Sequence, residues 1–173
     1  MKQSSYTLLG AVVSVLMGMS SSASQANGLA VAVVTRVSDG DTLWVRPLGG
    51  DGKQRPIKLR LQGIDAPERC QPWGPQATLA LSSKVLHKEV RLQTRGRDDH
   101  ERVLGNVWLG DEDVSAWMVE QGHAWSYRWR RSAGPYAPQE EKARQHKRGL
   151  FADAQAVEPR QFRKNNGPCA SNL

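Results

Sequence analysis

The chain has 173 residues, with 24 Lys and Arg against 17 Asp and Glu, and a formal net charge of +7. This length suits one domain with small additions, and a hydrophobic fraction of 39% with six Trp is enough for a folded core. The basic charge favours an anionic partner: nucleic acid, a glycan or a lipid surface. The four His lack the paired Cys/His spacing of a zinc site, and the sequence has no internal repeat, no P-loop and no Gly-x-Ser-x-Gly motif.

Residues 1–26 have the pattern of a secretory signal peptide. Lys2 precedes the apolar stretch "YTLLGAVVSVLMGM", and small residues follow, with cleavage options after Ala23 or Ala26. A membrane anchor is the alternative, but the apolar run is short for a membrane span. Cleavage leaves 23 basic and 17 acidic residues, a charge of +6. We therefore expect an exported protein, periplasmic or extracellular, without stable membrane association.

Short strands are predicted from Leu29 onward. Residues 29–37 are β-rich, and residues 41–47 follow the Asp39-Gly40 turn signal, which predicts a hairpin. Residues 47–56 have the composition of a loop. In residues 57–62, apolar and polar side chains alternate, so one face joins the core and the other carries Arg60 outward.

Helices dominate the second half of the chain. The patterns predict a helix opened by Pro75 over residues 75–89, strands around 90–92 and 103–109, a charged loop at 95–102, and helices over 111–122 and 138–148. Five short strands with one inserted and two appended helices indicate an α+β fold, a five-stranded OB-fold β-barrel with about three helices. Residues from about 153 to 173 are polar, and we expect them to be weakly ordered.

Acids and arginines crowd the stretch "RLQGIDAPERC", residues 60–70. Asp41, in "DGDT", and Asp65, in "DAPE", follow two different strands, so both carboxylates can face one hard cation such as Ca²⁺ together with water and a phosphate. The alternative is that each Asp only caps a turn, because Asp-Gly and Asp-x-Pro are ordinary turn sequences.

Cys70 and Cys169 are the two cysteines. An even number in an exported protein is consistent with one disulfide, and two free thiols are the alternative. A bridge would close a loop of roughly 100 residues. It would also hold the polar tail beside the loop that carries Glu68.

Several runs together carry a resemblance to a known family. They are "VSDGDTLWV", "KLRLQGIDAPE", "WGPQA", Asp98 to Arg102 as D-x-x-x-R, "MVEQGHAW" and "KARQHKRGLF". In these runs the chain resembles the thermonuclease family of staphylococcal-nuclease-like OB-fold domains over about residues 29–155. The resemblance implies a nuclease domain over residues 27–155, after the signal peptide, and a C-terminal tail of residues 156–173.

The resemblance also implies roles for individual residues. It makes Arg60 and Arg102 the catalytic arginines, Glu68 the general base, and Asp41, Asp65 and the Ala66 carbonyl the ligands of Ca²⁺. It implies cleavage that leaves 3′-phosphate ends. The family's usual glycine before the second arginine is Glu101 here. An acid at that place either weakens phosphate binding or turns outward.

The stretch "WSYRWRRS" mixes aromatic and basic side chains. Rings that stack on bases and guanidinium groups that follow phosphates suit unpaired nucleic acid, so Tyr127, Arg128, Trp129 and Arg130 are candidate binding residues. The alternative is a core-facing segment with solvated arginines, in which Trp125 joins the core.

The function predicted from these features is a secreted, monomeric, calcium-dependent nuclease that cleaves DNA, RNA or both with low sequence specificity. One alternative is a catalytically weak OB-fold module of the cell envelope that only binds nucleic acid. Another is a cationic envelope protein that binds glycans or lipid, which explains the charge but not the spacing from Arg60 to Glu68. All five matched side chains are present, and this favours the enzyme.

Overall fold

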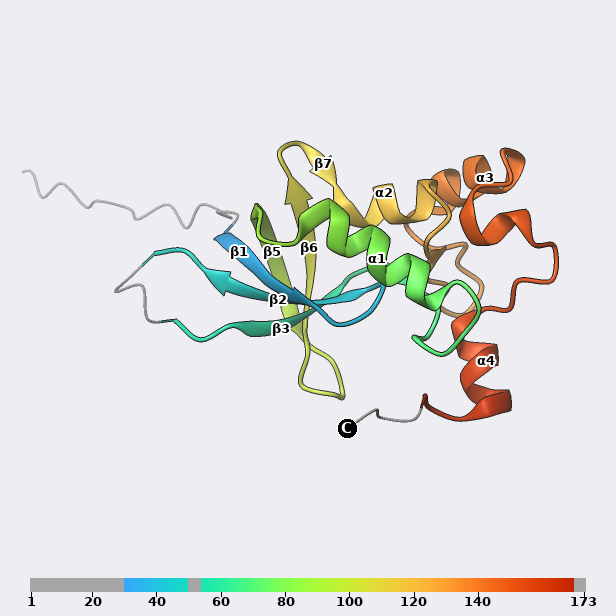
Figure 1. Cartoon of the computed structure of the whole chain (residues 1–173), viewed down its shortest axis with the longest axis horizontal. Helices are drawn as coiled ribbons and strands as arrows, with labels where there is room; N and C mark the ends of the chain where they lie inside the picture. The colour runs from blue at the N-terminus through green and yellow to red at the C-terminus, as the bar shows by residue number, and fades with distance from the viewer. Residues whose placement is uncertain (1–29, 50–53, 170–173) are drawn as a thin grey trace, which may run out of the picture.

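A closed barrel of five strands forms the centre of the computed structural model, which describes residues 30–49 and 54–169 (Figure 1). The predicted signal peptide lies outside the described residues. The barrel strands are β1 (Ala30–Val37), β2 (Thr42–Pro47), β3 (Ile57–Leu61), β5 (Glu89–Arg97) and β6 (Val103–Leu109). They pair antiparallel in the order β3-β2-β1-β5-β6, and a parallel pairing of β3 with β6 closes the barrel. The predicted α+β fold with a five-stranded OB-type barrel is confirmed.

Three strands of two residues each were not predicted. β4 (Ile64–Asp65) pairs with β8 (Trp125–Ser126), and β7 (Glu112–Asp113) pairs with the end of β6. Two residues are too few for a period-2 pattern, so the sequence carries no signal for them. The β4–β8 pairing fixes Asp65 next to the segment that begins at Tyr127.

The described part of the chain holds four α-helices, one more than expected. They are α1 (Gly74–Val85), α2 (Val114–Glu120), α3 (Ala137–Gln145) and α4 (Pro159–Asn166), with a 3₁₀ helix η1 (Gly149–Ala152) after α3. α1 ends four residues before the predicted boundary, because Leu86 is extended and His87 has a φ of 61°. The Asp113 side chain caps α2 by accepting from the Ser115 and Ala116 amides.

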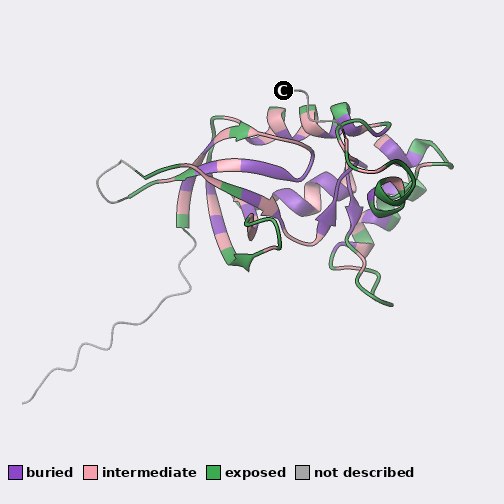
Figure 2. Ribbon diagram, turned by 90° about the horizontal axis from the view of Figure 1, so that it is seen from below, coloured by how far each residue is buried: buried purple, intermediate pink, exposed green. Residues whose placement is uncertain are grey.

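The core lies between the inner face of the barrel and the inner faces of α1 and α2, where buried residues gather (Figure 2). Alternate residues of β3, Leu59 and Leu61, are buried in it, as the pattern predicted. α1 contributes Ala77, Leu81 and Val85, whereas Leu79 faces solvent. No helix within the described ranges is long and apolar enough to cross a bilayer.

The C-terminal segment corrects the expectation of weak order after residue 153. Residues 159–166 form α4, which lies away from the barrel, beside the loop that leads into α1 (Figure 1). Within α4 only Pro159 is buried. A helix that buries so little has no apolar stripe that a sequence pattern can detect.

Candidate active site

Strand register brings the predicted acids to Arg60. Thr42 at the start of β2 lies opposite Arg60 in β3, so Asp41, one residue earlier, reaches the guanidinium. Arg60 Nη1 donates to Asp41 Oδ1 at 2.7 Å, and Nη2 donates to Asp65 Oδ1 at 2.9 Å. The three side chains are 17%, 6% and 7% exposed, respectively. Arg60 is therefore sandwiched between two nearly buried carboxylates.

The turn that carries Asp41 packs tightly on the loop after β4. The Ala66 amide donates to Asp41 Oδ2 at 3.1 Å, and the Thr42 hydroxyl donates to Oδ1 at 2.9 Å. A Cβ atom on Gly40 would come within 2.7 Å of the Ala66 Cβ, closer than real Cβ contacts allow. Glycine in the Asp-Gly-Asp turn thus lets the backbone that carries Asp41 approach Ala66.

Negative charge exceeds positive charge around Arg60. The Asp39 carboxylate accepts from the Asp41 amide, and burial together with repulsion by Asp41 raises the pKa of Asp39 to about 6. Burial and the Asp41 charge also raise the pKa of Asp65. Carboxylates that resist ionisation in this way mark a place where more positive charge would be stabilising.

Hard oxygen atoms in such a cluster are the donors that Ca²⁺ accepts, and two carboxylates with a backbone carbonyl leave positions for water or phosphate. The predicted ligands Asp41, Asp65 and Ala66 therefore fit this ion in donor chemistry. Among the described residues, no group of three or more His, Cys, Asp and Glu side chains is arranged to hold a metal.

Glu68 lies in the loop between β4 and α1, with its side chain 28% exposed. Its amide donates to Gln71 Oε1 at 3.1 Å. A Cβ atom on Gly74, the first residue of α1, would lie 1.9 Å from the Glu68 carbonyl oxygen. This loop therefore packs against the start of α1 in a way that only glycine at position 74 permits.

Arg102 comes from the turn between β5 and β6. Its Nε and Nη2 atoms each donate to Asp98 Oδ2 at 2.7 Å. Burial raises the pKa of Asp98, but hydrogen bonds from the Arg102 and His100 amides and from the Arg102 side chain outweigh it and hold the pKa below its ordinary value. This ion pair orients Arg102, which is one of the residues that line a pocket.

Glu101, the departure from the family pattern, has a φ of 59°, in the left-handed region that glycine adopts freely. Its side chain is exposed, and its carbonyl accepts from Arg97 Nη1 at 2.7 Å. The backbone shape of this turn thus suits a glycine, and the acid at this place lies at the surface.

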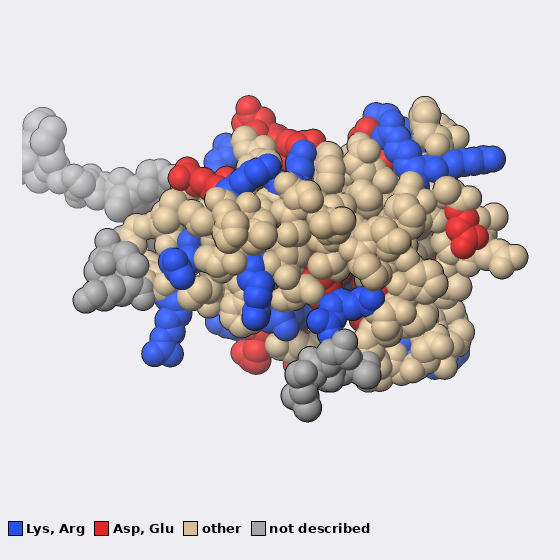
Figure 3. Space-filling view, in the orientation of Figure 1, with Lys and Arg blue, Asp and Glu red and all other residues tan. Residues whose placement is uncertain are grey.

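A pocket of about 890 Å³ is lined by most of the predicted site residues. Its walls include seven of the predicted site residues, namely Asp41, Arg60, Ala66, Glu68, Arg102, Tyr127 and Trp129. Asp65 is not among these lining residues, but its carboxylate accepts a hydrogen bond from Arg60, which is. In the space-filling view, basic and acidic side chains lie together below the centre of the face, between the barrel and α4 (Figure 3).

The four predicted binding residues after β8 form two groups: the two aromatic residues line the pocket, and the two arginines do not. Tyr127 and Trp129 line the pocket and are 41% and 62% exposed. Arg128 turns away to pair with Glu140 of α3 at 2.5 Å and with Glu158 at 2.7 Å. Arg130 is exposed and is not among the described residues that line the pocket. Trp125 is buried against Phe151, so the aromatic-basic stretch serves both the core and the pocket.

The structure also brings residues to the pocket that the sequence did not single out. Arg163 of α4 and Asp39 line it. A disulfide joins Cys70, two residues after Glu68, to Cys169, three residues after the end of α4. Cys169 lies near the end of the polar tail, so the possible pairing with Cys70 was the sequence feature that indicated that the tail reaches the site. Nothing in the pattern distinguished Arg163 from the other basic residues there.

The chain matches a known protein family. The family described as staphylococcal nuclease homologue matches residues 58–153, more than half of the chain. This protein belongs to the staphylococcal nuclease family.

The chain is also similar to individual known proteins, two of which have nuclease names. The chain is 37% identical to an "Uncharacterized endonuclease" of Haemophilus influenzae over 131 residues, which cover 76% of this chain and 71% of that protein. It is 35% identical to "Protein ParB" of Escherichia coli over 96% of both chains. It is 32% identical to a "Micrococcal nuclease" of Shigella flexneri, over 76% of this chain and 79% of that one. The predicted enzyme class, a nuclease, is confirmed.

Proposed function

We propose that this nuclease is an exported, calcium-dependent endonuclease that hydrolyses phosphodiester bonds of DNA, RNA or both with low sequence specificity. The observation that carries the proposal is that one pocket holds two arginines, Arg60 and Arg102, together with the carboxylate of Glu68. Relatives are named endonuclease and micrococcal nuclease, which supports the same reaction.

The chemistry follows from charge. Attack on a phosphodiester adds negative charge to the nonbridging oxygens, and guanidinium groups bind such oxygens in a bidentate manner. In this proposal Arg60 and Arg102 stabilise that charge, and Glu68 takes a proton from the attacking water. Losing one preorganised donor of this kind costs about 3 kcal/mol, or on the order of 100-fold in rate.

Asp41, Asp65 and the Ala66 carbonyl would hold the calcium ion. When bound, Ca²⁺ supplies further positive charge for the phosphate oxygens. The carboxylates of Asp41 and Asp65 also pair with Arg60, so the residues that would hold the ion are in direct contact with the arginine that would bind phosphate.

Two features support export to the periplasm or the medium. The first 26 residues have the signal-peptide pattern. The Cys70–Cys169 disulfide is a bond that persists in oxidising compartments. We propose that the mature protein acts as a monomer, free of the membrane.

The test is cleavage of single- and double-stranded DNA and RNA by the mature protein, with Ca²⁺ or with excess chelator. We expect cleavage with Ca²⁺ and none with chelator. The matched variant Glu68→Gln keeps the shape of the side chain and removes the base, so it should bind substrate normally and lose most turnover. Binding without cleavage by the wild-type protein under every condition would favour the alternative, an OB-fold module that only binds nucleic acid.

A further inference from the structure

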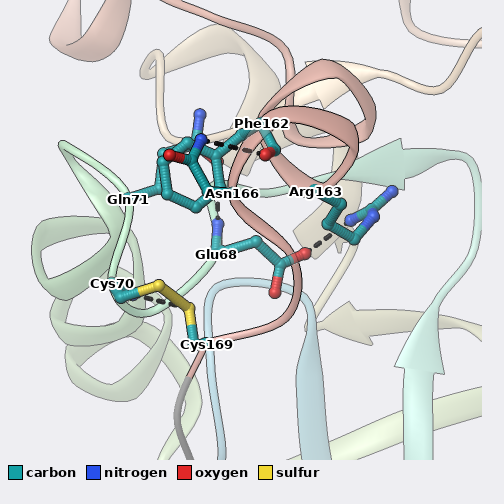
Figure 4. The surroundings of a disulfide bond; sticks show 7 residues. All are labelled: Glu68, Cys70, Gln71, Phe162, Arg163, Asn166 and Cys169. Atoms are coloured by element: carbon teal, nitrogen blue, oxygen red, sulfur yellow. Dashed lines mark hydrogen bonds and ion pairs between the residues drawn. A yellow bond between two sulfur atoms is a disulfide. The ribbon is translucent and has the colours of Figure 1, made fainter.

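The C-terminal segment is attached to the loop that carries Glu68 at three places. At its start, Gln71 Nε2 donates to the Val157 carbonyl at 2.6 Å. In its middle, Arg163 Nη1 donates to Glu68 Oε1 at 2.5 Å. At its end, Cys169 is bonded to Cys70. Figure 4 shows the Arg163 guanidinium directed at the Glu68 carboxylate, with the disulfide on the other side of the same loop.

Arg163 is well placed to fix the orientation of Glu68. The backbone of Glu68 is held by Gln71, but within the described residues the hydrogen bond to its carboxylate comes from Arg163 alone. The other nitrogen, Nη2, donates to Asp65 Oδ2 at 3.3 Å. One guanidinium thus bridges Glu68 to an aspartate that is anchored in the β4–β8 pairing.

We propose that Arg163 is a positioning residue for Glu68 and that the disulfide holds Arg163 in place. This inference rests on the proposed function, in which Glu68 takes a proton from water. The hydrogen bond from Arg163 is made to Oε1, so Oε2 is the oxygen that this proposal assigns to proton transfer. A catalytic group in a loop without regular structure needs such support, because a displacement of about 1 Å can cost on the order of 100-fold in rate.

The disulfide is needed because α4 is weakly attached by itself. The Arg163 side chain is 41% exposed, and Pro159 is the one buried residue of the helix. Exposed ion pairs hold a segment poorly. The covalent bond at Cys169, six residues after Arg163, keeps the guanidinium near Glu68.

The experiment compares steady-state cleavage of a single-stranded DNA oligonucleotide by four mature proteins in Ca²⁺. They are the wild type, Arg163→Ala, Arg163→Lys, and the control Arg160→Ala, which removes one exposed positive charge from the same helix. Loss of an outer positioning partner typically costs about 10- to 100-fold, so we expect that fall in kcat for Arg163→Ala with an unchanged KM. Arg163→Lys should recover part of kcat, because an ammonium group can also bond to Glu68, and the control should match the wild type.

A second comparison tests the disulfide. The pair Cys70→Ser with Cys169→Ser should lower kcat as Arg163→Ala does, and adding Arg163→Ala should cause no further loss, because both changes remove one interaction. Losses that multiply would overturn the role of the disulfide.

Other results would overturn the role of Arg163 itself. A raised KM with normal kcat would make Arg163 a phosphate-binding residue, and faster cleavage by Arg163→Ala would make it a block on the site. An active wild type with an equally active Arg163→Ala would refute this inference and leave the proposed function standing. A wild type that binds but never cleaves would overturn both.

Discussion

Replacing Cys70 and Cys169 together by serine removes the covalent link between the Glu68 loop and the C-terminal segment. The two residues are 99 positions apart, and the chain-entropy model gives about 4.7 kcal/mol for a loop of roughly 100 residues. That value assumes that the folded state is otherwise unchanged.

The structure indicates that removing the disulfide lowers the free energy of unfolding by less than this value. The ion pairs of Arg163 and of Glu158 involve side chains 41% and 50% exposed, and each such pair is worth about 0–1 kcal/mol. The hydrogen bond from Gln71 to Val157 adds about 1 kcal/mol. Ordering the backbone costs about 1–2 kcal/mol per residue, so the segment should detach once the bridge is absent. The detached C-terminal segment then regains chain entropy in the folded state. We therefore expect the free energy of unfolding to fall by about 2–4 kcal/mol, with the barrel intact.

Two assays check this expectation. Urea denaturation followed by Trp fluorescence gives the free energy of unfolding, with dithiothreitol-treated wild type as the comparison and the dithiothreitol-treated variant as the control. Limited trypsin digestion should cut the variant first at Arg160, Arg163 or Lys164, while the barrel remains whole. An unchanged unfolding free energy, together with a C-terminal segment still protected from trypsin, would refute the reasoning.

Three further predictions concern other parts of the molecule. The Tyr136 hydroxyl donates to Asp113, and burial with the Asp113 charge raises its pKa to about 12 from 10.0, so the folded state favours the neutral phenol. The stabilisation from the neutral phenol is present below pH 10 and is lost as pH rises towards 12. Urea denaturation should therefore show the free energy of unfolding fall by about 2–3 kcal/mol more in the wild type than in Tyr136→Phe. Equal falls in the two proteins would contradict the prediction. Glu101→Gly removes the strain of a left-handed backbone conformation at a residue that has a Cβ atom, so it should stabilise the folded state by about 1 kcal/mol. Thermal denaturation should show a higher midpoint for the variant, and a lower midpoint would contradict this reasoning. Trp129→Ala should weaken single-strand binding by about 1–3 kcal/mol in fluorescence anisotropy without changing the melting temperature, and unchanged affinity would remove Trp129 from the binding surface.

The local part of the site was predictable from sequence. Arg60 follows from strand alternation, since Leu59 and Leu61 on either side of it are buried. Asp41 immediately precedes β2 and Asp65 ends β4, and both carboxylates pair with Arg60. Asp41 is close to Arg60 because β2 and β3 are paired in the barrel, which a pattern of short strands implies, and Asp65 is close to Arg60 because only a short turn separates it from the end of β3.

The segment at residues 127–130 could be predicted only in part. The mixture of rings and guanidinium groups indicated binding, and Tyr127 and Trp129 do line the pocket. Arg128 is directed to Glu140 and Glu158, acids from elements that lie 12 and 30 residues later. Partners at such distances are chosen by packing, so the sequence of the segment itself gives no sign of them.

By itself the sequence determined the barrel, its core face and the acid-arginine cluster, because each depends on periodicity and on turns that act over a few residues. It also supplied Cys70 and Cys169, but not the path between them. The tertiary structure alone decided that α4 forms, that it lies against the Glu68 loop, and that Arg163 is the side chain that reaches the carboxylate. The physical reason is that α4 is a polar helix held by one covalent bond and a few ionic contacts. Its position therefore depends on where the rest of the fold places Cys70, Glu68 and Asp65.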